Sequence, residues 1–196
     1  MKAIAVTDRR HCCRPLLTQL ELICAAGADA VVLREKDLSP EKFEELAAAV
    51  LPICRRHGTE LCLNTFASAA VRLGIGSVLL PAPLFRSQPR PPVARVGVSV
   101  HSRAEGEEYI ARGVDFLVYG NVFPTTCKPG LPGRGFDELR QLCLDNEVPV
   151  YAIGGITPEN VQVVRDQGAD GVCFMSGLML AEDPTDVIAA VRKVRD

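Results

Sequence analysis

The residues of this 196-residue chain with the most reactive chemistry are concentrated in one segment, residues 119–135, which reads YGNVFPTTCKPGLPGRG. It carries the ammonium of Lys128, the guanidinium of Arg134, the hydroxyl of Thr125 and the thiol of Cys127. Its prolines and glycines restrain the backbone while leaving N–H groups uncovered. Because loops of this length in a compact domain are usually functional, we expect the segment to close on a phosphate or diphosphate. A surface loop without a function is the alternative.

Other polar residues follow short apolar runs, where parallel strands would end. Arg34 and Lys36 come directly after the apolar run 30–33. Side chains alternate along a strand, so if Val32 points into a barrel, Arg34 and Lys36 point toward its mouth. The alternative is a surface ion-pair cluster with the intervening Glu35.

The last two apolar runs end in small residues that could bind phosphate through main-chain N–H groups. A glycine lets the backbone approach an oxygen closely, although glycines that only form tight turns are the alternative. The candidate phosphate-binding residues at these ends are Gly154, Gly155, Ser176 and Gly177, and Asn64 and His101 end two earlier runs.

Short β-rich runs alternate with helical runs along the whole chain. Strands are predicted over residues 3–8, 30–34, 60–64, 77–80, 96–100, 115–119, 149–153 and 171–175. Helices are predicted over residues 15–26, 39–56, 67–73, 102–111, 136–145, 157–167 and 183–194. Five prolines between residues 81 and 92 predict that any helix there is short or absent.

Eight strand–helix units with apolar strands predict a parallel sheet covered by helices. The count favours an α/β fold with one domain over residues 1–196, a closed (β/α)8 TIM barrel. An open doubly wound sheet is the alternative, but no G-x-G-x-x-G follows the first strand. In such a barrel the ligand site lies at the carboxyl ends of the strands, where the polar residues above are found.

The composition indicates an ordinary globular protein whose partners are small molecules or copies of itself, as in a homo-oligomer. Net charge is -2, with 47% hydrophobic and 23% charged residues, and the cations are scattered. We therefore expect no nucleic-acid partner and no membrane partner, and a cytoplasmic location. The eight cysteines contain no C-x-x-C pair, so we expect most to be reduced packing residues. The vicinal pair Cys12 and Cys13 and the loop residue Cys127 are the exceptions.

Five segments in order resemble the signature segments of thiamine phosphate synthases and the related TenI-type thiazole tautomerases. They are residues 32–36, 97–102, 121–128 and 152–156 and the region around Ser176. The resemblance covers essentially the whole chain. It implies a protein of thiamine biosynthesis that binds small phosphorylated thiazole or pyrimidine ligands.

The synthases join a hydroxymethylpyrimidine diphosphate to a thiazole phosphate, with Mg²⁺ held by carboxylates. Arg34, Lys36, Thr125 and Lys128 match their diphosphate-handling positions. The positions of the metal carboxylates hold Thr65 and the neutral run 81–83 instead. Because a hard cation normally needs a carboxylate ligand, we predict no metal site and no cofactor, and Mg²⁺ only if the protein is a synthase.

The loop resembles the tautomerases more closely, since Cys-Lys is followed by Gly-Leu and Gly-Arg-Gly. These enzymes aromatise a thiazole carboxylate phosphate by a proton shift without a metal. The position of their proton-carrying histidine holds Asn121, a candidate ligand-binding residue whose amide cannot transfer protons near neutral pH. We therefore assign the catalytic role to His101, Cys127 and Lys128. The sequence predicts a tautomerase, with a synthase and a catalytically silent phosphate-ligand binder as the alternatives.

Overall fold

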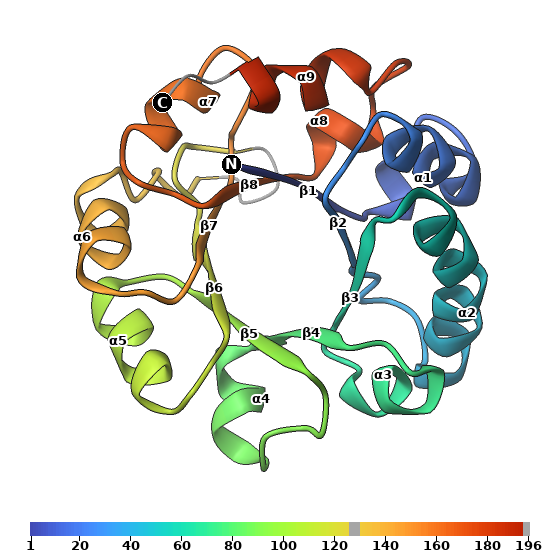
Figure 1. Ribbon diagram of the computed structural model, residues 1–196, viewed down its shortest axis with the longest axis horizontal. Coiled ribbons are helices and arrows are strands. Elements are labelled where there is room, and N and C mark those ends of the chain that lie inside the picture. The colour runs from blue at the N-terminus through green and yellow to red at the C-terminus, as the bar shows by residue number, and fades with distance from the viewer. Residues whose placement is uncertain (126–129, 194–196) are drawn as a thin grey trace.

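Eight parallel strands close into a barrel in the computed structural model, which describes residues 1–125 and 130–193 (Figure 1). Each strand pairs with the next along the chain, and the barrel closes where β1 pairs with β8, Ile4 opposite Cys173. The predicted (β/α)8 barrel is confirmed. The strands are β1 (Lys2–Val6), β2 (Ala30–Leu33), β3 (Glu60–Asn64), β4 (Ser77–Pro81), β5 (Arg95–Val100), β6 (Phe116–Gly120), β7 (Val150–Ile153) and β8 (Gly171–Phe174).

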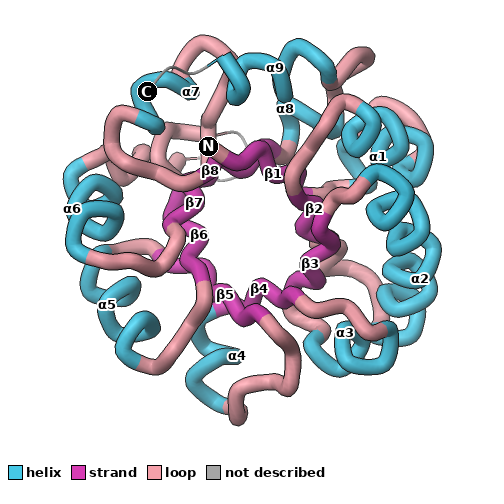
Figure 2. The backbone as a smooth tube through the Cα atoms, in the orientation of Figure 1, coloured by secondary structure: helices cyan, strands magenta, loops and turns pink. Residues whose placement is uncertain are grey.

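Helices surround the ring of strands on the outside (Figure 2). Within the described residues no helix is both long and apolar enough to cross a membrane. The helices are η1 (Arg9–His11, a 3-10 helix), α1 (Leu16–Ala25), α2 (Pro40–His57), α3 (Ala67–Leu73), α4 (Ala82–Ser87), α5 (Arg103–Ala111), α6 (Asp137–Asp145), α7 (Val161–Arg165), α8 (Ser176–Met179) and α9 (Thr185–Lys193).

The predicted helix over residues 157–167 is shorter than expected. The side chain of Asn160 accepts a hydrogen bond from the main-chain N–H of Thr157 (2.9 Å) and donates one to the carbonyl of Gly155 (2.9 Å). These bonds hold residues 157–160 as a turn, so that α7 begins only at Val161. The sequence pattern also missed η1 and α8, which are too short to show a helical period.

The core has two layers, because alternate side chains of each strand face opposite sides. One layer fills the barrel interior and includes Val32, Cys62, Phe116 and Cys173. The other packs between the strands and the surrounding helices. A Cβ atom at Gly97 would lie 2.2 Å from the Phe116 ring, so this glycine makes room for the phenylalanine.

The cysteines of the described residues are free thiols, as predicted. Cys24, Cys54, Cys62 and Cys173 are buried and contribute to the core. Burial raises the pKa of the Cys62 thiol to about 12, so this side chain behaves as a small hydrophobe.

Candidate active site at the barrel mouth

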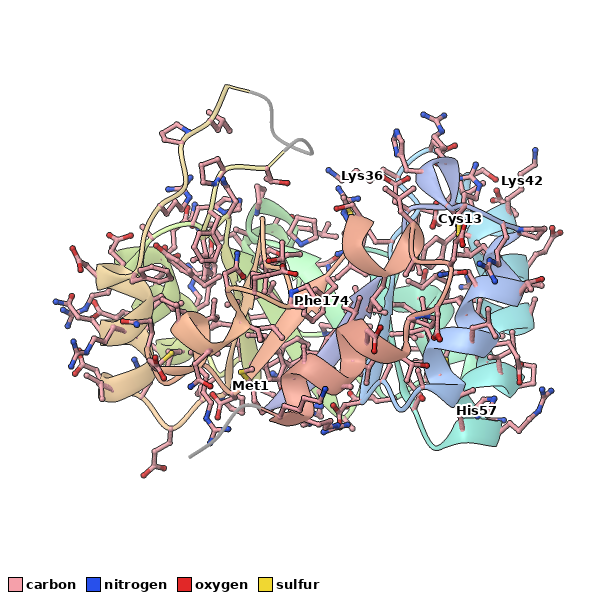
Figure 3. The ribbon with its side chains drawn as sticks, turned by 90° about the horizontal axis from the view of Figure 1, so that it is seen from above. Met1, Cys13, Lys36, Lys42, His57 and Phe174 are labelled. Atoms are coloured by element: carbon pink, nitrogen blue, oxygen red, sulfur yellow. The ribbon has the colours of Figure 1, made fainter. Side chains whose placement is uncertain are left out.

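The carboxyl ends of the eight strands form one end of the barrel, called the mouth below. Val32 and Cys62 face the interior, so the alternation along β2 and β3 brings Arg34 and Asn64 to the mouth. In the side view of Figure 3, Lys36 lies toward this end and His57 toward the opposite end. The mouth is where (β/α)8 barrels bind their ligands.

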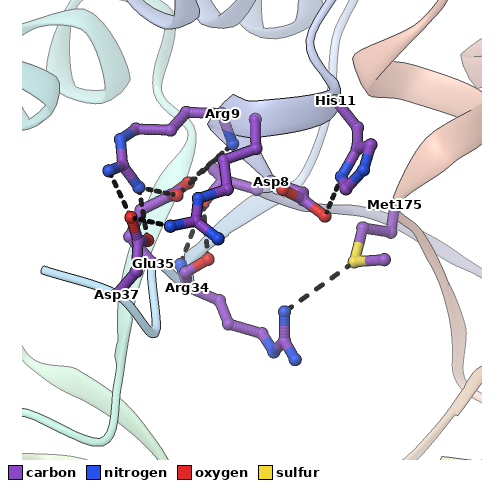
Figure 4. Close-up of polar contacts among 9 residues, drawn as sticks. Asp8, Arg9, His11, Arg34, Glu35, Asp37 and Met175 are labelled. Carbon is purple, nitrogen blue, oxygen red and sulfur yellow. Dashed lines mark hydrogen bonds and ion pairs between the residues drawn. The ribbon is translucent and has the colours of Figure 1, made fainter.

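Arg34 has a guanidinium group with no acidic partner among the described residues. Its main-chain N–H donates to the hydroxyl of Thr7 (2.9 Å), and its Nη1 lies 4.0 Å from the sulfur of Met175 (Figure 4). The positive charge of Arg34, followed by desolvation, lowers the pKa of the exposed Lys36 ammonium. Two cations that repel each other here create a favourable place for an anion of more than one negative charge.

Glu35, between these cations in sequence, pairs with a residue from another loop. This residue is 4% exposed, and its carboxylate accepts hydrogen bonds from the main-chain N–H (3.1 Å) and Nη1 (3.0 Å) of Arg9. Asp37 accepts two hydrogen bonds from Arg9, both 2.6 Å long, and lies 3.0 Å from Nη2 of Arg10 (Figure 4). The alternative of a local cluster between Arg34, Glu35 and Lys36 is therefore wrong. The network fixes the loops after β1 and β2, and within the described residues it leaves Arg34 and Lys36 without an acidic partner.

The Arg9–Asp37 pair predicts acid sensitivity. The hydrogen bonds from Arg9 hold the pKa of the Asp37 carboxyl well below its usual range. This carboxylate therefore stabilises the fold at pH values above about 4, the ordinary Asp pKa, and that contribution is lost as the pH falls below about 4. We expect the free energy of unfolding of the wild type to fall more steeply from pH 5 to pH 3, in urea titrations, than that of Asp37→Asn. Asp186→Asn, on the exposed face of α9, is the control, and equal slopes for wild type and Asp37→Asn would contradict the pairing.

His101 follows β5 and is half-buried at the mouth. Its Nδ1 lies 2.5 Å from the carbonyl oxygen of Gly120, and its main-chain N–H donates to Glu105 (2.7 Å). A carbonyl oxygen can only accept, so Nδ1 carries the hydrogen and Nε2 of the neutral ring keeps its lone pair. The ring is thus held in a form that can take up a proton at Nε2.

The described arms of the long loop, residues 121–125 and 130–135, are tied to each other by Asn121. This side chain is buried, and its Nδ2 donates to the carbonyls of Phe123 (3.1 Å) and Pro132 (3.3 Å). Both hydrogens of the Asn121 side-chain amide therefore form hydrogen bonds within the loop. Asn121, predicted to bind ligand, has a structural role that its position in the sequence did not reveal.

The other predicted loop residues are only partly described. The main-chain N–H of Arg134 donates to the carbonyl of Asn121 (2.9 Å), and its side chain is exposed. Thr125 is half-buried at the end of the first arm. Cys127 and Lys128 lie outside the described residues, so their roles stay predictions.

The ends of β7 and β8 are adjacent, since Ile153 pairs with Cys173. Four main-chain N–H groups at these ends donate no hydrogen bond within the described residues. Uncovered N–H groups on neighbouring loops can bind the oxygens of a phosphate. They are the N–H groups of the predicted residues Gly154, Gly155, Ser176 and Gly177.

The strand ends that would hold Mg²⁺ in a synthase have no carboxylate. The Thr65 hydroxyl donates to Oδ1 of Asn64 (3.1 Å). Nδ2 of Asn64 donates to the carbonyl of Leu79 (2.9 Å), so the amide of Asn64, a predicted binding residue, is engaged within the protein. After β4, residues 81–86 offer no side-chain oxygen. Across residues 1–125 and 130–193 no cluster of three or more His, Cys, Asp or Glu could hold a metal ion. The residues present at this mouth do not fit Mg²⁺.

Three polar residues follow β1, and two of them, Arg9 and His11, were not predicted to belong to the site. Arg9 anchors Glu35 and Asp37, and Asp8 lies 2.9 Å from Nδ1 of His11. The signal was present in the sequence as an Asp followed three residues later by a His, directly after the first apolar run.

Known proteins resemble this chain over almost its whole length. A family model described as thiamine monophosphate synthase matches residues 3–178. Thiamine-phosphate synthase of Enterococcus faecalis is 34% identical over 188 residues, which cover 92% of this chain and 87% of the relative. Thiamine-phosphate synthase of Moorella thermoacetica is 34% identical over 200 residues, which cover 98% of this chain and 93% of the relative.

Solved structures also resemble this chain over almost its whole length. Thiamine phosphate pyrophosphorylase from Pyrococcus furiosus superposes with a TM-score of 0.85 at 27% identity, covering 98% of this chain and 94% of that one. A 3-hexulose-6-phosphate synthase, 16% identical with a TM-score of 0.69, shares the fold. From the barrel, the matched segments and these relatives, we conclude that this chain belongs to the thiamine monophosphate synthase family.

Proposed function

We propose that this protein is a transferase of the thiamine-phosphate-synthase type, which joins a hydroxymethylpyrimidine diphosphate to a thiazole phosphate. One observation carries the proposal: Arg34 and Lys36 are two neighbouring cations at the mouth with no acidic partner among residues 1–125 and 130–193, at positions that resemble the diphosphate-handling residues of the family. The two relatives at 34% identity described above are both named thiamine-phosphate synthase. Their names favour the transferase over the isomerase that the loop sequence predicts.

In this reaction the bond between the pyrimidine methylene carbon and the diphosphate oxygen breaks, and a bond from that carbon to the thiazole nitrogen forms. The diphosphate leaves with the electron pair. Arg34 and Lys36 would stabilise the negative charge that develops on it. The uncovered N–H groups after β7 and β8 would bind the phosphate of the thiazole. Because the mouth does not fit Mg²⁺, we assign the stabilisation of charge to these protein groups.

A thiazole tautomerase is the second candidate, and the arrangement of His101 favours it. Moving a proton between two atoms of a ring needs a side chain that titrates near neutral pH. The hydrogen bond from Nδ1 to Gly120 leaves Nε2 of His101 available for that task. The neutral ends of β3 and β4 also agree with a reaction that needs no metal.

The deciding experiment gives the purified protein both sets of substrates. Thiamine phosphate formation is followed by chromatography, with Mg²⁺ and with EDTA, and aromatisation of the thiazole carboxylate phosphate is followed by NMR. We expect thiamine phosphate to form in both media. Aromatisation alone would establish the isomerase, and binding of thiazole phosphate without either product would establish the silent binder.

A further inference from the structure

Asp8 and His11 form an imidazole–carboxylate pair at the mouth that no step above uses. Nδ1 of His11 lies 2.9 Å from Oδ2 of Asp8 (Figure 4). An ionised carboxylate can only accept, so Nδ1 donates the hydrogen. When the ring is protonated, its second proton is on Nε2. The His11 side chain is 73% exposed, so Nε2 is accessible to a ligand.

The pair and Arg34 both lie next to the segment formed by Met175 and α8. The pair lies on the loop that follows β1, and η1 packs against α8, which contains no ionisable residue. Figure 4 shows the His11 ring on the same side as Met175, toward which Nη1 of Arg34 extends.

The other charged groups around His11 come from its own loop and from the loop after β2. The two acids of the β2 loop are paired with Arg9 and Arg10, so Asp8 is the carboxylate that acts on the ring. Arg14 of the first loop is turned to the carbonyl of Glu182 (2.9 Å). Besides His11 itself, the charged groups of these two loops are Asp8, Arg9, Arg10, Arg14, Arg34, Glu35, Lys36 and Asp37.

We propose that His11, oriented by Asp8, is the proton donor to the departing diphosphate. This inference rests on the proposed transferase function. As the carbon–oxygen bond breaks, the electron pair goes to the diphosphate oxygen, which takes the proton from Nε2 of the His11 imidazolium. The neutral ring that remains regains a proton from water. Asp8 stabilises the imidazolium, and protonation of the leaving group supplies charge neutralisation at a mouth that does not fit Mg²⁺.

The other two histidines of the chain are placed differently. His57 lies toward the opposite end of the barrel (Figure 3), and its Nε2 is 2.7 Å from Glu21. His101 follows β5, which lies across the ring from β1 in Figure 1. His57 therefore serves as a control that shares the imidazole but not the mouth.

The test is an NMR titration of the three histidine rings with and without saturating inorganic diphosphate and with EDTA present. An anion next to the ring favours its protonated form, so we expect the His11 titration midpoint to move to higher pH by about one unit or more, while that of His57 stays in place. Diphosphate that binds without moving the His11 midpoint would overturn the proton-donor role and leave the transferase proposal intact. Absence of diphosphate binding would contradict both.

Kinetics give a second, independent measurement. His11→Gln is expected to lower kcat by about 100-fold, the low end for a general acid, and to remove the fall of wild-type kcat that accompanies deprotonation of His11. Asp8→Asn should lower kcat while keeping a pH-dependent profile. His57→Gln is the control for the loss of a histidine. An unchanged pH profile in His11→Gln would refute the inference.

Discussion

Replacing Arg34 by glutamine is expected to weaken the binding of inorganic diphosphate by about 10- to 150-fold, the range for one hydrogen bond to a charged group. The guanidinium has no acidic partner within the described residues, so its charge and its donors are available to the ligand. Glutamine keeps a polar side chain of moderate length but lacks the positive charge and the planar set of N–H donors with which a guanidinium binds two phosphate oxygens at once. Calorimetric titration in buffer with EDTA measures the two dissociation constants.

Two further variants make the Arg34 prediction specific. Arg34→Lys keeps the positive charge but lacks the paired N–H donors of the guanidinium, so its loss of affinity for diphosphate should be smaller than that of Arg34→Gln. Arg55→Gln is the matched control, because Arg55 lies in the last turn of α2, an exposed arginine at the other end of the barrel without an ion pair among the described residues. Equal affinities for wild type and Arg34→Gln would show that the diphosphate does not bind at this end of β2.

The barrel could be predicted from the sequence because each strand is a short apolar run and most helices have a clear boundary signal. Ser39 and Ser102 cap the N-termini of α2 and α5, and Gly58 ends α2 in the left-handed conformation. Short elements without such signals were missed. At residues 157–160 the Asn160 side chain competes with the helix for main-chain partners, a choice that capping rules alone do not resolve.

The gathering of the candidate residues at one end of the barrel could also be predicted, because topology alone brings all strand ends to one mouth. The partners of its side chains could not. Glu35 follows Arg34 in sequence but pairs with Arg9 from another strand end, and this contact exists only once β1 and β2 lie side by side. Asn64 and Asn121 end strands like ligand-binding residues, yet both turn their amides to carbonyls of the protein. The Asn64 amide reaches Leu79 on the neighbouring strand, and the Asn121 amide reaches Pro132 on the far arm of the loop as well as the nearby Phe123, so these contacts need the folded arrangement.

Gly154→Ala is expected to lower the free energy of unfolding by about 2–5 kcal/mol and to weaken binding of thiazole phosphate as well. Gly154 has φ +103, and a Cβ there would lie 2.7 Å from the Cα of Asn121. The left-handed conformation costs an alanine about 1–2 kcal/mol, and the forced backbone shift costs about 1–3 kcal/mol more. Equilibrium unfolding in urea measures the sum.

Gly27→Ala separates the two contributions to that loss. Gly27 has a similar φ of +93, but a Cβ there would have no atom within 4 Å. The Gly27→Ala variant should therefore lose only the stability that the left-handed conformation costs an alanine, about 1–2 kcal/mol, and its ligand binding should stay unchanged. The main-chain N–H of Phe123 donates to the carbonyl of Gly154 (3.1 Å), so moving Gly154 away from Asn121 also moves the loop arm at the mouth. If the two alanine variants lose equal stability and bind equally well, then close packing between the end of β7 and this arm does not position the site.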